Sequence, residues 1–594
     1  MAASVVPARF ELRNEVPWSA AFGDVYHSAE GGPAQAEHVF LAGNGLPERW
    51  AGRERFTILE TGFGFGLNFL ATLRAWRRDP RRCRRLHYVA VEKHPFALDD
   101  LRSLHGNYPE LSEEAAALHA AWPVLVSGTH RLDLGNAILT LVLGDISLLR
   151  ELRLAADAIY LDGFAPAKNP EMWTHQVMRS VSRLAAAEAT AATWSVAGDV
   201  RHALEATGFA VEKRPGFGTK REMLVARNQR PVSARGLPER KALVIGAGLA
   251  GAALCERLCA RGWEVELRER HAEPAQEASG NLAGTFHPVV TPDDSVFARI
   301  TRAAFLYSLR RWQSLETPRW DRCGVLQLAR NDKELESQRR ALAGLPAEYA
   351  QLVTREEASR HAGVPVAAAG VWFPEGGWIQ PQSLVRAQLE ACGDRLHRRF
   401  GSEVKALEAG RTVILANSAD APKLHAVPGL RLRRVRGQLT YLPEAALEAP
   451  HAVVLRGGMV LPPIDGVCLV GATYDLEDAD AALREDSHAG NLERLKNILG
   501  VEPKARHWQG RVAFRAVTPD RLPLVGKIAD GVYGAFAYGS RGLVWAALAA
   551  EIIASELEGE PLPVEASLSG ALAPERFRRR AESRGSPRAR RAGP

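Results

Sequence analysis

The 594-residue sequence predicts an α/β protein built from two successive nucleotide-binding sheets. Three observations lead to this fold class. Short apolar runs alternate with helical patterns over residues 56–226, as in a doubly wound parallel sheet. That stretch contains a glycine-rich turn, Glu60-Thr-Gly62-Phe-Gly64-Phe-Gly66, and a second turn, Gly246-Ala-Gly248-Leu-Ala-Gly251, opens a new stretch. Because each turn follows a strand-like run and starts a helix-like run, we expect two cofactor domains in one polypeptide.

The first domain is expected to span residues 1–228. Its strands are expected at residues 56–60, 87–92, 139–143, 158–161 and 191–196, with helices at residues 67–76 and 171–187. Two further runs, residues 209–213 and 222–226, flank a Pro-Gly-Phe-Gly turn and predict a hairpin. A closing antiparallel hairpin on such a sheet is typical of class I methyltransferases.

A polar stretch with two prolines and a glycine, residues 229–240, predicts an interdomain linker. The second domain, residues 241–570, begins with a βαβ unit: a strand at residues 242–245, a helix at 249–261 and a strand at 264–267. Its remainder mixes helices with many short strands. Residues 571–594 are expected to form a basic, disordered tail.

Composition narrows the class of protein. Hydrophobic content of 46% and charged content of 24% are ordinary for a globular chain. The six cysteines include no CxxC pair, which indicates reduced cytosolic thiols rather than a disulfide framework or a zinc site, so we expect no metal. The N-terminus lacks a signal core, and no apolar run reaches the ~18 residues of a membrane helix, so we expect a cytoplasmic protein.

The net charge of +7 comes mostly from the end of the chain. Residues 574–594 contain eight arginines and two glutamates. This tail is compatible with nucleic-acid binding, and a solvated end without a partner explains it equally well. Two other arginine clusters, at residues 77–85 and 431–436, are further candidates for phosphate contacts.

The first glycine-rich turn is the core of the first candidate site. Glu92 ends the next expected strand and is placed to bind ribose hydroxyls, and Asp145 ends the following one and could bind an adenine amino group. With the closing hairpin, these acids favour S-adenosylmethionine over a dinucleotide; the alternative is a glycine turn in a nucleotide-free domain. The expected cofactor contacts are Glu60, Gly62, Gly64, Gly66, Glu92 and Asp145.

Asp162 is the candidate catalytic residue of this domain. It follows the fourth expected strand in Leu161-Asp-Gly-Phe-Ala-Pro166, and ligands of open α/β sheets bind at the carboxyl ends of strands. A carboxylate beside a nitrogen nucleophile can accept its N–H and orient its lone pair. A plain turn residue is the alternative.

The second turn carries a strong dinucleotide pattern. The glycines Gly246, Gly248 and Gly251 open a helix whose N-terminus can bind a pyrophosphate, and Glu269 ends the second strand, where it can bind ribose hydroxyls. A turn-rich loop follows soon after, as flavoenzymes place one beside the flavin. It favours FAD over NAD and adds the candidate contacts Ser279, Gly280 and Asn281.

Near the far end, Phe514-Arg515 and Tyr538-Gly539-Ser-Arg541-Gly542 resemble the closing motifs of the glycine oxidase and D-amino-acid oxidase group. The resemblance implies an FAD domain with an α+β substrate subdomain of that type. It also implies that Arg515 binds a substrate carboxylate, for which a planar guanidinium is suited, and that Arg541 lies by the flavin. The alternative for Arg515 is a structural ion pair.

Taken in order, these pieces resemble the MnmC family of bifunctional enzymes, which complete 5-methylaminomethyl-2-thiouridine in bacterial tRNA. The matching stretches are residues 39–50, 60–69, 161–173, 216–224, 244–251 and 539–543. Of these, Asn44-Gly-Leu-Pro47 and residues 162–170 are distinctive, whereas the glycine turns are generic. The basic tail is not part of the family pattern.

The resemblance implies two reactions on a tRNA wobble uridine. The FAD domain would oxidise a carboxymethylaminomethyl group to 5-aminomethyluridine and glyoxylate, and the first domain would then methylate the amine with S-adenosylmethionine. The enzyme is expected to act as a monomer. One alternative is an N-alkylglycine oxidase fused to an N-methyltransferase that acts on a free small amine. Another is that one domain is a silent tRNA-binding scaffold.

Overall fold

The computed structural model describes residues 5–14, 16–231, 239–408, 410–504 and 508–578. Contacts divide the chain into two units, each described here by itself. Among the described residues, the N-terminal unit comprises those from 5 to 231 together with Glu558–Ala566, and the C-terminal unit comprises those from 239 to 557 and from 567 to 578. The N-terminal unit is therefore completed by a short segment from far along the chain.

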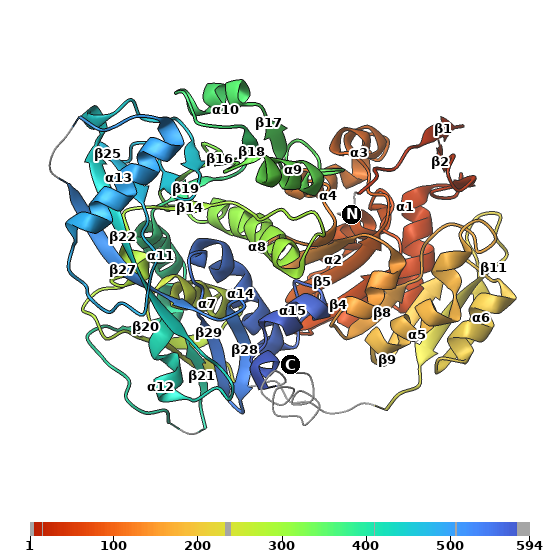
Figure 1. Ribbon diagram of the computed structural model, residues 1–594. Coiled ribbons are helices and arrows are strands. Elements are labelled where there is room, and N and C mark those ends of the chain that lie inside the picture. Colours follow the sequence, from red (N-terminus) through yellow and green to blue (C-terminus); the bar gives the residue numbers. More distant parts are fainter. Residues whose placement is uncertain (1–4, 15, 232–238, 409, 505–507, 579–594) are drawn as a thin grey trace, which may run out of the picture. The chain divides into compact units, whose positions relative to one another are not determined.

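An eight-stranded sheet forms the centre of the N-terminal unit, in the order β10-β11-β9-β8-β4-β5-β7-β6 (Figure 1). The central strands β7, β5, β4, β8 and β9 are parallel, whereas β6, β11 and β10 are antiparallel to their neighbours. The strands are β4 Arg55–Glu60, β5 Arg85–Glu92, β6 Gly128–Leu134, β7 Ala137–Leu143, β8 Ala156–Tyr160, β9 Ala185–Thr193, β10 Phe209–Pro215 and β11 Glu222–Asn228. The predicted hairpin is thus present as β10 and β11.

Apolar side chains cover both faces of this sheet. Along β5, Tyr88 belongs to one buried cluster and Val89 to the other, as the two-residue repeat of a strand requires. A central strand buried on both faces reads as a continuous apolar run, which is the pattern that predicted it. The helices of this unit are α1 Gly32–Gln35, α2 Leu67–Arg78, α3 Leu98–His105, α4 Ser112–Ala121, α5 His175–Leu184 and α6 Gly198–Glu205.

Two parts of the N-terminal unit were not expected. A small antiparallel sheet precedes the main one, with strands β1 Glu11–Arg13, β2 Val16–Ser19 and β3 Asp24–Val25. The edge strand β6 was also missed, because it carries the polar residues His130 and Arg131 in buried positions. The distinctive Asn44 motif is structural: Asn44 is fully buried and accepts a hydrogen bond from Thr190 Oγ1 at 2.6 Å.

In the C-terminal unit, one sheet carries the dinucleotide fold, in the order β20-β13-β12-β21-β29-β28. All neighbours are parallel except β28 and β29. Its strands are β12 Lys241–Ile245, β13 Glu264–Arg268, β20 Leu396–Arg399, β21 Thr412–Leu415, β28 Leu524–Ala529 and β29 Val532–Phe536. Helix α7, Leu249–Cys259, is buried along its whole length, so its apolar composition reflects a central position.

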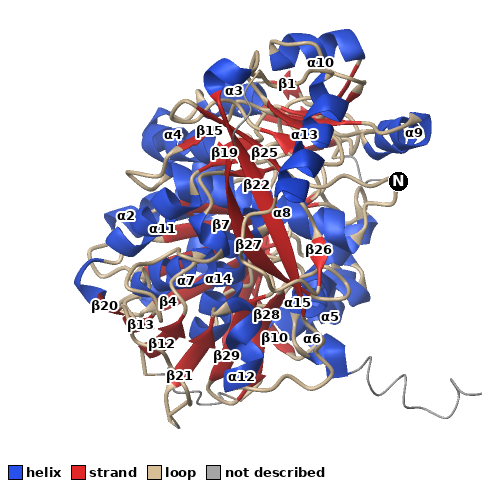
Figure 2. Cartoon of the chain, turned by 60° about the vertical axis from the view of Figure 1, so that its left-hand side comes forward, coloured by secondary structure: helices blue, strands red, loops and turns tan. Residues whose placement is uncertain are grey.

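A second, mixed sheet forms the α+β part of the C-terminal unit. Its order is β17-β18-β16-β23-β24-β25-β22-β26, with β27 also paired to β22. Figure 2 shows β22 and β27 as long neighbouring strands, and their antiparallel register runs from Arg433 opposite Val517 to Tyr441 opposite Gln509. The strands are β16 Val325–Leu328, β17 Gln351–Val353, β18 Gly370–Phe373, β22 Arg433–Pro443, β23 Val453–Leu455, β24 Met459–Val460, β25 Val467–Gly471, β26 Asp475–Leu476 and β27 Gln509–Val517.

The remaining elements of the C-terminal unit complete it around these two sheets. A three-stranded sheet consists of β14 Gly284–Phe286, β15 Trp320–Asp321 and β19 Gly377–Ile379. The other helices are α8 Val296–Gln313, α9 Asp332–Ala341, α10 Arg355–Ala362, α11 Pro381–Glu390, α12 Ala421–Leu424, α13 Glu485–Leu499, α14 Gly542–Glu558 and α15 Ala566–Leu572. Across the described part of the chain, no helix has both the length and the apolar character needed to cross a bilayer.

The expected domain boundaries differ from the structure at the C-terminal end. Helix α15 runs to Leu572, and Phe577 is only 3% exposed. Arg576 pairs with Asp520 at 3.1 Å. Residues 571–578 therefore pack into the C-terminal unit instead of belonging to a tail, while residues 579–594 lie outside the described part. At the predicted linker, β11 ends at Asn228 and β12 begins at Lys241, and residues 232–238 are not described.

Candidate active sites

The cavity of the N-terminal unit lies where the sheet order changes direction. Strands β4 and β8 are neighbours, but the chain leaves them towards opposite sides of the sheet, which opens a crevice at their carboxyl ends. The loops after these strands are joined directly: Thr61 N–H donates to Tyr160 O at 3.1 Å, and Thr61 Oγ1 donates to Asp162 O at 2.8 Å. The resulting cavity has a volume of about 320 Å³.

The glycine-rich turn forms one wall of this cavity. A side chain at Gly62 would come within 3.0 Å of the Asp162 carbonyl, and Gly64 has a φ of +54°, which disfavours other residues. The Glu92 carboxylate accepts from the N–H groups of Gly64 and His94, both at 2.7 Å. Burial raises the pKa of Glu92, and these two donors oppose that shift. Glu92 thus ties the turn to the end of β5 while lining the cavity.

Asp162 lines the same cavity, and three groups orient its carboxylate. Oδ1 accepts from Gly163 N–H at 2.9 Å and from Trp194 Nε1 at 3.3 Å, while Oδ2 accepts from Asn68 Nδ2 at 2.7 Å. Burial raises the pKa of Asp162 to about 6, because the apolar surroundings disfavour the charged form more than the three donors stabilise it. A carboxylate in this range can act as a base near neutral pH.

Glu60 lies behind the cavity wall, where it does not line the cavity. It is fully buried, and its Oε1 accepts from Asn68 Nδ2 at 2.8 Å. Burial and the nearby Asp162 raise the pKa of Glu60 well above its usual range. Gly66 also lies outside the lining and instead precedes α2 with a φ of +83°. Asp145 lines the cavity and accepts from Ser147 N–H at 3.0 Å.

Aromatic side chains enclose the mouth of this cavity. Phe22, from the small N-terminal sheet region, stacks on Phe164 with ring centres 4.6 Å apart, and Tyr26 meets Phe164 edge to face at 5.1 Å. The Lys220 ammonium lies 4.1 Å from the Trp194 ring. Flat apolar walls of this kind suit a nucleobase. Sequence reasoning missed Phe22, Tyr26 and Asn68, whereas Phe164, which follows Asp162 in its motif, was predicted as a wall for the acceptor.

The cavity of the C-terminal unit, about 820 Å³, also lies where strand order reverses, between β12 and β21. A side chain at Gly246 would come within 2.8 Å of the Ala416 carbonyl, and one at Gly251 would lie 1.8 Å from the Gly246 carbonyl. Gly251 therefore allows α7 to start directly against the turn. Glu269 accepts from Ala247 N–H at 2.8 Å and His271 N–H at 3.0 Å, and it lines the cavity.

Polar atoms on the wall of this cavity fit a flavin dinucleotide. Gly248 caps α7, and Ser279 Oγ accepts from the first helical N–H, that of Leu249, at 3.1 Å. Several buried lining atoms have no hydrogen-bond partner among the described residues, and buried polar atoms rarely remain unpaired. These atoms are Asn281 Oδ1, Thr285 Oγ1, His287 Nδ1, Asn417 Oδ1 and Tyr538 OH. A ligand with hydroxyl, phosphate and ring polar groups would satisfy them.

The remaining candidate contacts divide into two groups. Gly539, Arg541 and Gly542 line the cavity, whereas Gly280 does not. Arg541 donates to His287 O at 3.2 Å, and burial lowers the pKa of Arg541 to about 10. Gly280 packs against the Arg511 guanidinium, which a side chain there would meet at 2.3 Å.

Arg515 projects from β27 into the cavity formed with the second sheet. A side chain at Gly437 on the paired strand β22 would lie 2.3 Å from Arg515 Nη1, so this glycine makes room for the guanidinium. Arg515 donates to Thr473 O at 3.2 Å and lies 5.8 Å from the Tyr474 ring. Burial lowers the pKa of Arg515, which increases its affinity for an anion that neutralises it. Tyr474 lies in a loop after β25 and gave no sequence signal.

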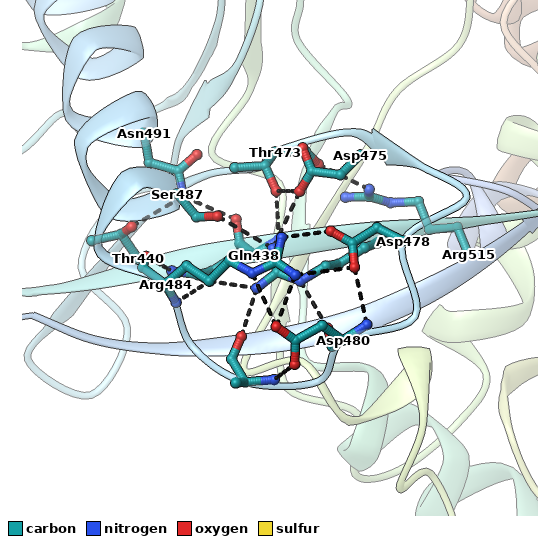
Figure 3. Close-up of polar contacts among 12 residues, drawn as sticks. Gln438, Thr440, Thr473, Asp475, Asp478, Asp480, Arg484, Ser487, Asn491 and Arg515 are labelled. Atoms are coloured by element: carbon teal, nitrogen blue, oxygen red, sulfur yellow. Dashed lines mark hydrogen bonds and ion pairs between the residues drawn. The ribbon is translucent and has the colours of Figure 1, made fainter.

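A polar network fixes the loop that carries Thr473 and Tyr474 (Figure 3). Arg484 pairs with Asp478 at 2.5 Å and with Asp480 at 2.8 Å. Arg436 is fully buried and donates to Asp475 Oδ2 at 3.2 Å. Arg436 was expected among possible phosphate contacts, and that expectation is wrong, because its guanidinium is enclosed within the protein.

A methyl-donor cavity in one doubly wound sheet and a dinucleotide cavity beside a second sheet define a bifunctional enzyme class, a methyltransferase joined to a flavin-dependent oxidoreductase. Residues 109–229 match the family model "S-adenosyl-L-methionine-dependent methyltransferase", and residues 241–556 match "FAD dependent oxidoreductase". The expected fold class and both expected cofactors are confirmed.

Curated relatives cover nearly the whole chain. A "tRNA 5-methylaminomethyl-2-thiouridine biosynthesis bifunctional protein MnmC" from Paraburkholderia phytofirmans is 48% identical over 98% of this chain and 99% of its own length. A protein of the same name from Azoarcus sp. is 46% identical over 96% of this chain and 98% of its own length. The chain belongs to the MnmC family. Glycine oxidase from Bacillus cereus, a solved structure, is 17% identical over 54% of this chain and 98% of its own, with a TM-score of 0.46.

Proposed function

We propose that this chain completes a modified wobble uridine in tRNA by two successive reactions. The C-terminal unit oxidises the carboxymethylaminomethyl group of the uridine to an aminomethyl group and releases glyoxylate. The N-terminal unit then methylates the amine to give 5-methylaminomethyl-2-thiouridine. The names of two relatives that match both units support this assignment.

One observation carries the proposal: each cavity contains the group that its own reaction needs. Arg515 presents a guanidinium in the oxidoreductase cavity, where a substrate with a carboxylate next to a CH–NH group would be held. Asp162 presents an oriented carboxylate in the methyltransferase cavity, where a nitrogen nucleophile would be held. An N-substituted glycine followed by its amine product matches these two groups in that order.

In the oxidation, Arg515 binds the substrate carboxylate and Tyr474 packs beside the guanidinium. FAD, when bound, would supply the hydride-acceptor chemistry that the oxidation of the glycine methylene needs. The resulting substrate imine reacts with water, which breaks the C–N bond and leaves the aminomethyl group on the uridine. The residues that would hold the cofactor are those of the turn, Glu269 and the loop at Ser279.

In the methylation, Asp162 holds the amine and accepts its proton. S-adenosylmethionine, when bound, supplies the methyl group, with Gly62, Gly64 and Glu92 on the wall that would hold it. The aromatic residues at the cavity mouth would stack on the uridine. Because a tRNA substrate is handled in the cytoplasm, we place the enzyme there, acting as a monomer in which each cavity is complete within its own unit.

Nucleoside analysis tests this proposal against the alternative of a free small amine substrate. The purified enzyme, with FAD and S-adenosylmethionine, is given tRNA from a strain that lacks it, or free N-methylglycine. We expect loss of the carboxymethylaminomethyl nucleoside and appearance of the methylaminomethyl nucleoside by mass spectrometry. Turnover of N-methylglycine with unchanged tRNA would establish the alternative. Activity of only one unit would indicate a silent scaffold.

A further inference from the structure

Asn68 is an unassigned side chain in the methyltransferase cavity. It is the second residue of α2, immediately after the glycine-rich turn, and it lines the cavity beside Asp162. Its Nδ2 donates to Glu60 Oε1 at 2.8 Å and to Asp162 Oδ2 at 2.7 Å. An amide nitrogen has two N–H groups, so both are used by these acids.

These two bonds fix the orientation of the amide. Both N–H groups of the amide are taken up by Glu60 and Asp162, so only its oxygen is left to interact with a ligand. Asn68 Oδ1 forms no hydrogen bond to any described residue, although Asn68 is only partly exposed. Asn68 and Asp162 are neighbours that both line the cavity, so the amide oxygen of Asn68 and the carboxylate of Asp162 are two acceptors available to one ligand.

We propose that Asn68 and Asp162 together hold the acceptor amine by its two N–H groups and thereby limit the reaction to one methyl transfer. This proposal rests on the proposed function of the cavity as an amine methyltransferase site. With one N–H on each acceptor, the nitrogen lone pair has a single remaining direction. Orienting a nucleophile in this way is a recognised source of rate.

The chemistry balances with the residues present. The nitrogen lone pair forms the N–C bond while the C–S bond of the methyl donor breaks, and its electron pair goes to sulfur. The nitrogen then carries the positive charge and two hydrogens. One proton moves to the Asp162 carboxylate, which leaves a neutral secondary amine with a single N–H.

That product no longer matches the site. A second transfer needs the neutral amine, and its one N–H can satisfy only one of the two acceptors. The other acceptor then loses the partner that the primary amine gives it, and an unpaired acceptor at the binding site disfavours binding. We therefore expect the wild-type enzyme to use the primary amine roughly 10- to 100-fold better than the methylated one.

The test compares two tRNAs, one with aminomethyluridine and one with methylaminomethyluridine, as acceptors of labelled methyl groups. The full chain is used as wild type, Asn68→Leu and Asn68→Ala. Leucine fills the same space without the amide, and alanine also removes volume. Asn107→Ala, at an exposed position, is the matched control. Binding of S-adenosylmethionine is checked by calorimetry.

We expect both Asn68 variants to lose the 10- to 100-fold preference and to accumulate a dimethylaminomethyl nucleoside, while Asn107→Ala keeps the wild-type preference. Preference retained in Asn68→Leu but lost in Asn68→Ala would assign the limit to volume and overturn the proposal. Equal wild-type rates on the two tRNAs would also overturn it, without any variant. A wild type that methylates neither tRNA would instead reject the proposed function.

Discussion

The two glycine-rich turns share one hydrogen-bonding pattern but differ in the residues that pack behind them. In each, a glutamate at the end of the second strand accepts from an N–H of the turn: Glu92 from Gly64 and Glu269 from Ala247. In each, the cavity lies where strand order reverses. The difference is what stands behind the turn. Behind the first turn lies a buried acid, Glu60, which Asn68 bonds from the cavity side; behind the second lies the close backbone of Gly251.

The two units also differ in where the expected cofactor contacts and the expected catalytic residue lie. They share one sheet in the N-terminal unit and lie on two sheets in the C-terminal unit. In the N-terminal unit, Asp162 follows the strand next to the turn, so donor and acceptor sites share one sheet. In the C-terminal unit the turn belongs to the six-stranded sheet, while Arg515 belongs to the nine-stranded one. Under the proposed function, the six-stranded sheet would hold the flavin and the nine-stranded sheet would hold the substrate carboxylate.

The largest effect that would sharpen this comparison is expected at Gly251. In Gly251→Ala the new methyl would lie 1.8 Å from the Gly246 carbonyl, so the turn must move and the pyrophosphate position is lost. We expect a colourless protein, measured by flavin absorbance, that still methylates aminomethyl tRNA. Gly570→Ala, a helical position with open space, is the control and should stay yellow. A yellow Gly251→Ala protein would contradict the assignment of the turn.

Asp162→Ala should remove methyl transfer and spare oxidation. Loss of an oriented base typically lowers the rate by ~10²–10⁴-fold, and 5-aminomethyluridine should accumulate in tRNA. Because burial raises the pKa of Asp162 to about 6, the wild-type methyl transfer rate should fall as pH drops below that value and the base becomes protonated. Rates are measured with saturating substrates. Normal product from the alanine variant would make Asp162 a turn residue.

Arg515→Ala should block the oxidation and spare methyl transfer. Each charge-assisted hydrogen bond lost is worth roughly 1.5–3 kcal/mol, so the carboxymethylaminomethyl nucleoside should persist while added aminomethyl tRNA is still methylated. Arg515→Lys should restore little, because an ammonium lacks the planar fork. Gly437→Ala should show a weaker form of the same block, since its methyl displaces the guanidinium. Full oxidation by Arg515→Ala would move the carboxylate site to another arginine that lines the cavity, Arg434 or Arg541.

The sequence predicted the first site better than the second, for a physical reason. Strand ends, spacing and period identified Glu92, Asp145 and Asp162, because the residues of one parallel sheet meet at its carboxyl edge. Arg515 came only from a resemblance, since no local pattern shows that β27 pairs with β22 across the fold.

Other contacts were beyond sequence reasoning altogether. Tyr474 lies in an irregular loop, and Phe22 comes from a small sheet whose strands are two to four residues long, too short to show a period. Glu60 looked like a cofactor ligand because it precedes the turn, yet its side chain points behind the wall. Side chains along a strand alternate between the two faces of the sheet, so a shift of one residue decides whether a side chain enters the cavity or lies behind its wall.

A smaller effect is expected where the N-terminal unit depends on Glu558–Ala566. Glu560 is 5% exposed and pairs with Arg85 at 2.8 Å, with Arg131 at 3.7 Å. Removing one partner of a buried ion pair costs ~3–5 kcal/mol, so Glu560→Gln should lower the melting temperature of this unit in calorimetry. The exposed Glu113→Gln should change it little. A fragment that ends at residue 231 should be less stable still, and equal stability would show the segment to be dispensable.

The smallest effect is expected from the chain end. Because residues 571–578 pack into the fold, a clean deletion removes only residues 579–594, with six arginines and one glutamate. If these arginines contact phosphates, tRNA binding weakens and its salt dependence becomes shallower, since fewer counterions are released. Both activities should survive at saturating tRNA. A variant in which glutamine replaces the six arginines keeps the length of the segment and removes its positive charge, so it separates the two effects. An unchanged salt slope in both variants would move the tRNA footprint to the cluster at residues 77–85.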